Sequence, residues 1–250
     1  MAEHVGFGAR LAWVLDHREL GVEELADRAG LSAEDVRAVI AGAAPGEGPL
    51  RRLAPALGFH TVDLLILAGL AVPDDLAPLD VGAERWARDA LLDVVRIPAS
   101  MRGEPLRVAR SLPQEERTGG FTPKGLAPLV DEPGNKVIRM LRYRNLGWSG
   151  MAHALAFVTP TYLSAATYGV IGSGRKDLTP RLITDFAVLL GIDARELAAF
   201  TGVDLGEVSL PSPEGADAAA LLWELRRLTA AQAQHVAELA RSLRGDSRNG

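Results

Sequence analysis

The sequence of 250 residues contains no cysteine, and this absence removes several classes of protein at once. Disulfide-stabilised folds and thiolate metal sites both need cysteine, so we expect a reducing compartment. Aromatic residues are scarce at 5%, whereas apolar residues of all kinds make up 48% and charged residues 24%. An alanine- and leucine-rich chain with this balance is typical of a soluble helical protein, and its length allows one or two domains.

Long hydrophobic runs are also missing. The most apolar stretch, residues 64–72, is much shorter than the roughly 20 residues that a membrane-spanning helix needs. The first residues lack the basic and then apolar pattern of a secretory signal. We therefore expect a cytoplasmic protein with no membrane partner.

Side chains for catalysis or metal binding are few and scattered. No serine lies in a nucleophile-elbow motif, and without cysteine covalent catalysis has no candidate. A Gly-rich stretch at residues 169–176 resembles a phosphate-binding loop, but Arg175 replaces the lysine that such a loop requires. The histidines lack the i, i+4 spacing of a helical metal site; they are His4, His17, His60, His153 and His235. The sequence predicts no enzyme, no metal site and no cofactor.

Short amphipathic helices are predicted along the chain, and their order repeats. The first set comprises residues 7–19, 22–29, 33–41, 50–57 and 61–69, and Ser32 is the expected N-cap of its third helix. The second set begins at residues 137–145 and ends at residues 196–202. Landmarks recur about 130 residues later: Leu20-Gly21 as Leu146-Gly147, Gly58 as Gly191, and residues 109–112 (Ala-Arg-Ser-Leu) as residues 240–243. We expect an internal duplication.

The repeat predicts an all-α fold of two tandem five-helix domains, each followed by a helical hairpin. The expected segments are a first domain at 1–75, a hairpin at 76–113, a Pro/Gly linker at 114–134, a second domain at 135–206, and a C-terminal hairpin at 216–244. Residues 209–215 are predicted to be a shorter linker and residues 245–250 a frayed tail. The apolar spacing within residues 221–243 fits either packing on the second domain or a dimer surface.

Residues 146–176 contain the pattern on which the functional prediction depends. Apolar spacing predicts a helix over residues 148–155, followed by a four-residue turn at 156–159. Thr159-Pro160 is typical of a helix start, because threonine is a common N-cap residue and the first turn of a helix accepts proline. Two short helices joined by a tight turn are typical of a helix-turn-helix, whose second helix enters the major groove. That helix would display Thr161, Tyr162, Ser164 and Thr167.

The chain resembles the Cro/repressor-type (XRE) helix-turn-helix family. The residues that carry the resemblance are Glu24 to Ser32 (Glu-Leu-Ala-Asp-Arg-Ala-Gly-Leu-Ser), Ile40-Ala41-Gly42, and Leu53 to Gly58. The second half also resembles actinobacterial tandem proteins of this family through residues 162–169, 174–176 and 178–180. The resemblance implies two repressor-type helix-turn-helix domains and DNA binding as a class.

Charge distinguishes the two copies, although the net charge of −5 argues against a general nucleic-acid binder. Residues 10–52 contain six positive and eight negative side chains, whereas residues 136–176 contain six positive and none negative. Because phosphate neutralisation drives DNA affinity, we expect the second copy to bind DNA. Its predicted contacts are Arg142, Arg144, Trp148, Ser149, Thr159, Thr161, Tyr162, Ser164, Thr167, Arg175 and Lys176.

Alternatives remain at several of these positions. Tyr162 and Tyr168 fit core residues as well as groove contacts, and Trp148 fits packing on either a sugar or the preceding helix. Glu34 and Asp35 at the start of the first copy's third helix suit an N-terminus better than a DNA surface. We therefore expect the first copy to be an interaction or dimerisation module.

Two function hypotheses follow. The first is a sequence-specific transcriptional regulator that binds double-stranded DNA as a homodimer or an intramolecular pseudo-dimer. The second is a protein-interaction adaptor in which both folds have lost DNA contact, which the acidic total would suit.

Overall fold

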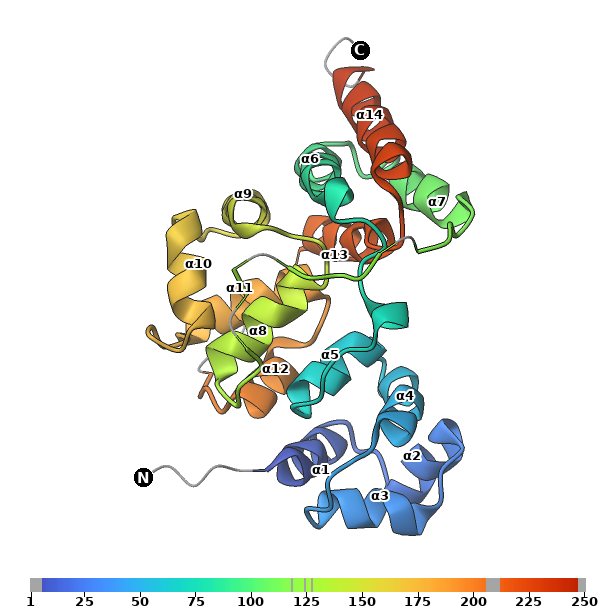
Figure 1. The fold of residues 1–250 in the computed structure, drawn as a ribbon, viewed down its shortest axis with the longest axis vertical. Coiled ribbons are helices and arrows are strands. Elements are labelled where there is room, and N and C mark those ends of the chain that lie inside the picture. The colour runs from blue at the N-terminus through green and yellow to red at the C-terminus, as the bar shows by residue number, and fades with distance from the viewer. Residues whose placement is uncertain (1–5, 118, 124, 127, 206–211, 247–250) are drawn as a thin grey trace.

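The computed structural model describes residues 6–117, 119–123, 125–126, 128–205 and 212–246, and Figure 1 shows their arrangement. Within these ranges the chain forms fourteen α-helices and two short 3-10 helices, with no β-strand. The predicted all-α class is confirmed. Alanine and leucine, which dominate the composition, have the strongest helix propensities. None of the helices in these ranges is both long and apolar enough to cross a membrane.

The first five helices form one unit, residues 7–67, in the lower part of Figure 1. They are α1 (Phe7–His17), α2 (Val22–Ala29), α3 (Ala33–Ile40), α4 (Glu47–Ala56) and α5 (Thr61–Leu67). Local signals set these bounds: Gly30 ends α2 in the left-handed conformation, and Ser32 caps α3 by accepting from the Asp35 amide at 3.0 Å. The predicted bounds of α2 and the predicted Ser32 cap are confirmed.

A second unit of five helices occupies residues 133–201. Its helices are α8 (Pro133–Arg142), α9 (Trp148–Val158), α10 (Ala165–Gly172), α11 (Pro180–Leu190) and α12 (Ala194–Thr201). Thr179 caps α11 by accepting from the Leu182 amide at 3.3 Å, and Gly191 ends that helix with a positive φ of 67°.

The predicted turn between α9 and α10 was wrong. Thr159 does not begin a helix: it follows α9, and its hydroxyl donates back to the Leu155 carbonyl at 2.8 Å. Helix α9 therefore continues three residues beyond the predicted end at residue 155, and α10 starts at Ala165 with Ser164 as its N-cap. The turn covers residues 159–164 rather than 156–159, and the Gly-rich stretch at 169–176 is helical as far as Gly172.

The two hairpins lie together in the upper part of Figure 1. They are α6 (Glu84–Val94) with α7 (Gly103–Ser111), and α13 (Pro213–Leu225) with α14 (Ala230–Asp246); η1 (Asp74–Leu76) and η2 (Val81–Ala83) precede α6. Helix α14 packs on α6, and α13 packs on α7 and on α11. The apolar face predicted within residues 221–243 is thus covered by its own unit and by the first hairpin. Of the predicted linker at 209–215, residues 209–211 lie outside the described residues, as do residues 247–250 of the predicted tail.

Each helix pair that packs within the first unit has a counterpart in the second unit, in which α8 also packs on α11 and α12. The first unit pairs α1 with α3, α2 with α3, α2 with α4, and α4 with α5. The second unit pairs α8 with α10, α9 with α10, α9 with α11, and α11 with α12. Between the units, α1 packs on α12 and α5 packs on α8. The inter-unit contact is therefore reciprocal, as in a two-fold symmetric dimer.

Backbone details follow the same correspondence. Among the described residues, Glu19 and Asn145 are the non-glycine residues with positive φ, at 53° and 60°, and both follow the first helix of their unit. Gly8 and Gly134 each lie where a Cβ atom would strike a carbonyl oxygen near the end of the third helix, of Val39 and of Ile171 respectively. Absence of a side chain lets the first and third helices of each unit approach closely.

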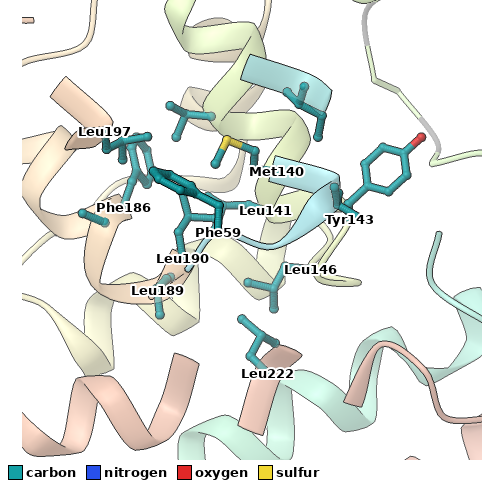
Figure 2. Close-up of a cluster of buried hydrophobic side chains, with 14 of the residues drawn as sticks. Phe59, Met140, Leu141, Tyr143, Leu146, Phe186, Leu189, Leu190, Leu197 and Leu222 are labelled. Carbon is teal, nitrogen blue, oxygen red and sulfur yellow. The ribbon is translucent and has the colours of Figure 1, made fainter. Parts of the chain in front are cut away.

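The core is continuous across the contact between the units. Phe59, which precedes α5, lies in Figure 2 among Leu141 from α8 and Leu190 from α11. All three are buried, and Phe59 also makes an edge-to-face contact with Phe200 at 5.8 Å between ring centroids. Apolar burial of this kind is the main force that holds the units together.

Candidate nucleic-acid interface

Arg144, predicted as a phosphate contact, lies instead in the core between the units. Its side chain is 0% exposed, and its two Nη atoms each lie 2.7 Å from a carboxylate oxygen of Asp63 in α5. Nη2 also donates to the Leu190 carbonyl at 2.8 Å. This bidentate, fully desolvated arrangement leaves no path to a phosphate, so the predicted role of Arg144 was wrong.

Arg18 occupies the corresponding place in the first unit and makes the corresponding bonds. Its Nε and Nη2 form a bidentate pair with Glu196 in α12, the latter at 2.6 Å, and its Nη1 donates to the Leu57 carbonyl at 2.5 Å. Arg18 and Arg144 are 126 residues apart, while their carboxylate partners and their carbonyl partners are each 133 apart. One ion pair therefore joins an arginine of the first unit to a carboxylate of the second, and the other joins an arginine of the second unit to a carboxylate of the first.

A third pair of bonds repeats this relation. Arg10 in α1 donates through Nη1 to the carbonyl of Phe200, and Lys136 in α8 donates through Nζ to the carbonyl of Leu67 at 3.0 Å. These carbonyls belong to the last turn of α12 and of α5, where the helix dipole favours a cation. Lys136 is buried and also pairs with Asp131.

Arg142 is the second predicted phosphate contact that the structure removes from the surface. It is buried, donates to the Leu146 carbonyl at 2.9 Å, and lies 3.6 Å from Glu84 at the start of α6. Burial lowers the pKa of its guanidinium, and the Glu84 carboxylate opposes that effect. Its predicted DNA contact was wrong for the same reason as that of Arg144: another helix covers it.

The charge count over residues 136–176 therefore overstated the surface charge. Lys136, Arg142 and Arg144 are buried, and Arg139 is half-buried beside Tyr143. All four belong to or directly follow α8, which packs on α5. Of the six positive side chains counted there, Arg175 and Lys176 are the exposed ones.

The turn before α10 is held from inside by two predicted contact residues. Thr159 is buried with its hydroxyl on Leu155, and Thr161 is buried with its hydroxyl donating to Asp185 of α11. Burial raises the pKa of Asp185, and the Thr161 bond opposes this. Both threonines position the turn and do not face solvent, so their predicted base contacts were wrong.

Tyr162 lies at the tip of that turn and is 79% exposed, which removes the core alternative for this residue. Tyr168 is the opposite case: it is 0% exposed and packs against Phe186 of α11 at 6.3 Å between ring centroids. Burial raises the pKa of the Tyr168 hydroxyl to about 12. The two tyrosines thus divide between surface and core.

The outer face of α10 is uncharged. Ser164 and Ala166 are exposed and Thr167 is half-buried, with 3.0 Å between the Ser164 and Thr167 hydroxyl oxygens. Val170 is half-buried on the next turn of the same helix. Hydroxyls and small apolar groups are able to contact base edges and thymine methyl groups.

Three cations border this face. Arg175 and Lys176 follow α10 and are exposed, and the Arg175 Nε donates to the Ser173 hydroxyl at 2.9 Å. Arg181 at the start of α11 is exposed, and its Nη2 holds the Pro160 carbonyl at 2.7 Å. The sequence did not predict a role for Arg181. Its hydrogen bond to the Pro160 carbonyl places it next to the turn that contains Tyr162.

The remaining predicted contacts lie at the start of α9. Ser149 is exposed, whereas Trp148 is half-buried, with the Arg142 guanidinium 5.3 Å from its ring centroid. Trp148 and Arg175 both line a groove of about 590 Å³ beside α10, together with Leu126 and Val170. The structure therefore brings two predicted contacts, Trp148 and Arg175, to one groove with Ala166 and Val170, whereas Ser164 and Thr167 do not line it.

The corresponding surface of the first unit is acidic and internally paired. Glu34 and Asp35 are exposed at the start of α3, and Ser32 donates to Asp35 at 2.7 Å. Each arginine of this surface is engaged by protein: Arg28 pairs with Glu24, Arg37 with Glu23, Arg51 with Glu47 and Asp75, and Arg52 donates to the Gly30 carbonyl. This surface offers phosphates little unpaired positive charge.

The chain matches no protein-family model, no curated protein and no solved structure. The described part of the chain also brings together no group of three metal-ligating side chains.

Comparison of the units with each other locates a signal that the sequence prediction missed. Leu31-Ser32-Ala33 at the start of α3 recurs as Leu163-Ser164-Ala165 at the start of α10, 132 residues later. Both serines are N-caps. This tripeptide, rather than Thr159-Pro160, marks the start of α10. In the resulting alignment of the two units, Ala166 corresponds to Glu34 and Thr167 corresponds to Asp35.

Proposed function

We propose that the protein is a sequence-specific DNA-binding regulator of transcription, built from two repeated helix-turn-helix units, with α10 as the helix that enters the major groove. The observation that carries this proposal is the uncharged, exposed face of α10 with Arg175, Lys176 and Arg181 beside it. In such an arrangement the hydroxyl and methyl groups of the helix would contact base edges, and the neighbouring cations would contact the phosphates.

The proposed contact set is smaller than the sequence predicted. Bases would meet Ser164, Ala166, Thr167 and Val170, and phosphates would meet Arg175, Lys176 and Arg181. Three phosphate contacts imply that the logarithm of affinity falls with the logarithm of salt concentration with a slope of about −3. A slope of about −5 would be expected if all six cations counted over residues 136–176 took part.

Charge reversal at the two loop cations tests the proposal. The chain would be used to select duplexes from a random DNA library, and the enriched duplex would be titrated in gel-shift assays. R175E/K176E should weaken binding at least about tenfold and reduce the salt slope by about 2. The matched control is A43E/A44E, because these exposed residues occupy the corresponding positions after α3.

The control should bind like the unmodified chain. Equal affinity of R175E/K176E and the unmodified chain would refute the proposed contact, and failure to enrich any duplex at low salt would refute the proposed function.

A second candidate, a protein-interaction adaptor, is favoured by the acidic α3 surface. Exposed carboxylates such as Glu34 and Asp35 would suit a basic protein partner. Retention of a partner that is lost in E34A/D35T but kept in R175E/K176E, together with no DNA binding, would support the adaptor.

A further inference from the structure

We propose that a single chain binds a single asymmetric DNA site, in which only one half-site is read. This inference rests on the proposed function and specifies its substrate: duplex DNA with one non-palindromic half-site. In helix-turn-helix dimers the two-fold symmetry of the protein is mirrored by a palindromic operator. An asymmetric operator follows if the contact between units is two-fold but their DNA-facing surfaces differ.

The two-fold contact between the units is already made within the chain. Arg18 with Glu196 and Arg144 with Asp63 exchange ion pairs across the contact, and Arg10 and Lys136 exchange bonds to the last turns of α12 and α5. Asp63, Arg144 and Glu196 are buried by these partners. Arg18, Arg144 and their carboxylate partners are already engaged within the chain, so the chain itself takes the place of a dimer.

Corresponding positions of α3 and α10 carry different chemistry. Glu34 of α3 corresponds to Ala166 of α10, and Asp35 corresponds to Thr167. After the helices, Ala43 and Ala44 correspond to Arg175 and Lys176. Each of these four differences makes the first unit more negative than the second, whereas Arg37 of α3, which corresponds to Gly169, is a difference of the opposite sign.

The charge on α3 opposes an approach to DNA. Two exposed carboxylates at the start of α3 would face the phosphates and base edges that its counterpart α10 approaches, and like charges repel there. The one arginine within α3, Arg37, is paired with Glu23. Figure 1 shows α3 and α10 on the outer edges of the paired units, so α3 is not covered by the second unit. The first unit therefore supports α10 without reading bases.

The test is a selection of duplexes from a random library with the full chain, followed by measurement of the mass of the protein–DNA complex in solution. The expected motif is not self-complementary, and the expected complex contains one chain per duplex. A palindromic motif or two chains per duplex would overturn the inference while leaving DNA binding intact. No enrichment of any sequence would refute the proposed function itself, so the two failures are distinguishable.

Exchange of the helix surfaces gives the second measurement. E34A/D35T should select the same motif as the unmodified chain, with affinity within about threefold, because α3 does not read bases. A166E/T167D should lose at least about tenfold in affinity, since it gives α10 the carboxylates of α3. Circular dichroism and the unfolding midpoint would establish that both variants fold, as expected for substitutions of exposed or half-buried side chains. A changed or extended motif for E34A/D35T would overturn the inference.

Discussion

Residues 7–67 and residues 133–201 fold into the same order of five helices, yet their surfaces differ in charge. The surface around α3 is acidic, whereas the outer face of α10 is uncharged and is followed by exposed cations. Their shared features belong to the backbone and to helix packing: the positive φ of Glu19 and Asn145, the close helix approach at Gly8 and Gly134, and the reciprocal ion pairs of Arg18 and Arg144. Their differences lie at solvent-facing positions, where Glu34 and Asp35 stand opposite Ala166 and Thr167. The comparison teaches that packing constrains what is kept between the repeats, whereas exposed positions are free to diverge.

The two units also differ in how deeply they bury equivalent groups. Arg144 is 0% exposed, whereas the side chain of Arg18 is 32% exposed. Hairpin helices α6 and α13 both pack against the second unit, α6 on α9 and α13 on α11, which covers more of its surface. Corresponding substitutions should therefore have unequal effects.

The largest expected effect is at the ion pairs. R144M should reduce the free energy of unfolding by about 3–5 kcal/mol, because it leaves Asp63 buried without a partner. R18M should cost about 1–2 kcal/mol, since water reaches its site and reduces the penalty for leaving Glu196 unpaired. Urea unfolding of both variants measures this difference.

The double variant R144M/D63L is the control for the mechanism. It should regain part of the stability lost in R144M, because an apolar pair replaces the unpaired carboxylate. Equal losses in R144M and R18M would show that the difference in burial between the two sites has no energetic consequence.

The next effect concerns His60, which precedes α5 and corresponds to Asp193 before α12. His60 stacks on Trp223 at 3.5 Å between ring centroids, and burial lowers its pKa from 6.5 to about 4. In the unfolded chain His60 therefore binds a proton near pH 6.5, whereas in the folded chain it remains neutral down to about pH 4. Stability should fall across that window, by about 3 kcal/mol at pH 4 from this residue alone.

Unfolding titrations of H60F between pH 7 and pH 4 measure this contribution, because phenylalanine keeps a ring against Trp223 and does not titrate. The dependence on pH should be shallower in H60F than in the unmodified chain. H153F, at an exposed position, is the control and should retain the full dependence. Identical curves for H60F and the unmodified chain would exclude a half-buried, neutral His60 as a source of the pH dependence.

A smaller effect is expected at the paired glycines. G8A and G134A should each lower stability by about 1–3 kcal/mol, because the added methyl group would press on the Val39 or Ile171 carbonyl oxygen. G21A, where a methyl group meets no atom within 4 Å, should change stability by less than about 0.5 kcal/mol. Thermal unfolding midpoints measure all three. A neutral G134A beside a damaging G8A would show that the close approach is not shared.

The smallest expected difference is at the helix caps. Ser32 accepts from the Asp35 amide, whereas Ser164 makes no side-chain cap bond and instead contacts the Thr167 hydroxyl. S32A should cost about 1 kcal/mol, and S164A less than about half of that. Chemical unfolding of the two variants checks this order, and a larger cost for S164A would contradict it.

Much of the helical framework was predictable because its signals are local. Gly30, Ser32 and Gly191 act on atoms within a few residues of themselves, so α2, the start of α3 and the end of α11 could be read from the sequence. The start of α10 could not be read in the same way. Thr159-Pro160 has the form of a helix start, but the Thr159 hydroxyl bonds back to Leu155 and Thr161 is held by Asp185.

The candidate site was predictable only where exposure follows from the local pattern. Arg175 and Lys176 lie in a loop after α10 and are exposed as expected. Arg142 and Arg144 were counted as surface charge because a sequence does not show which face of α8 another helix will cover. Arg181 was overlooked because its link to Pro160 depends on how α11 lies against the turn.

The sequence by itself determined the helical class and the positions of most helices, because propensities, caps and breaks operate over one or two turns of chain. Tertiary structure alone decided which charges face solvent. Asp63 and Arg144 are 81 residues apart, and only the packing of α5 on α8 buries them together. Burial depends on such distant contacts. For this reason four of the six cations within residues 136–176 are buried or half-buried, and their charges are compensated inside the protein.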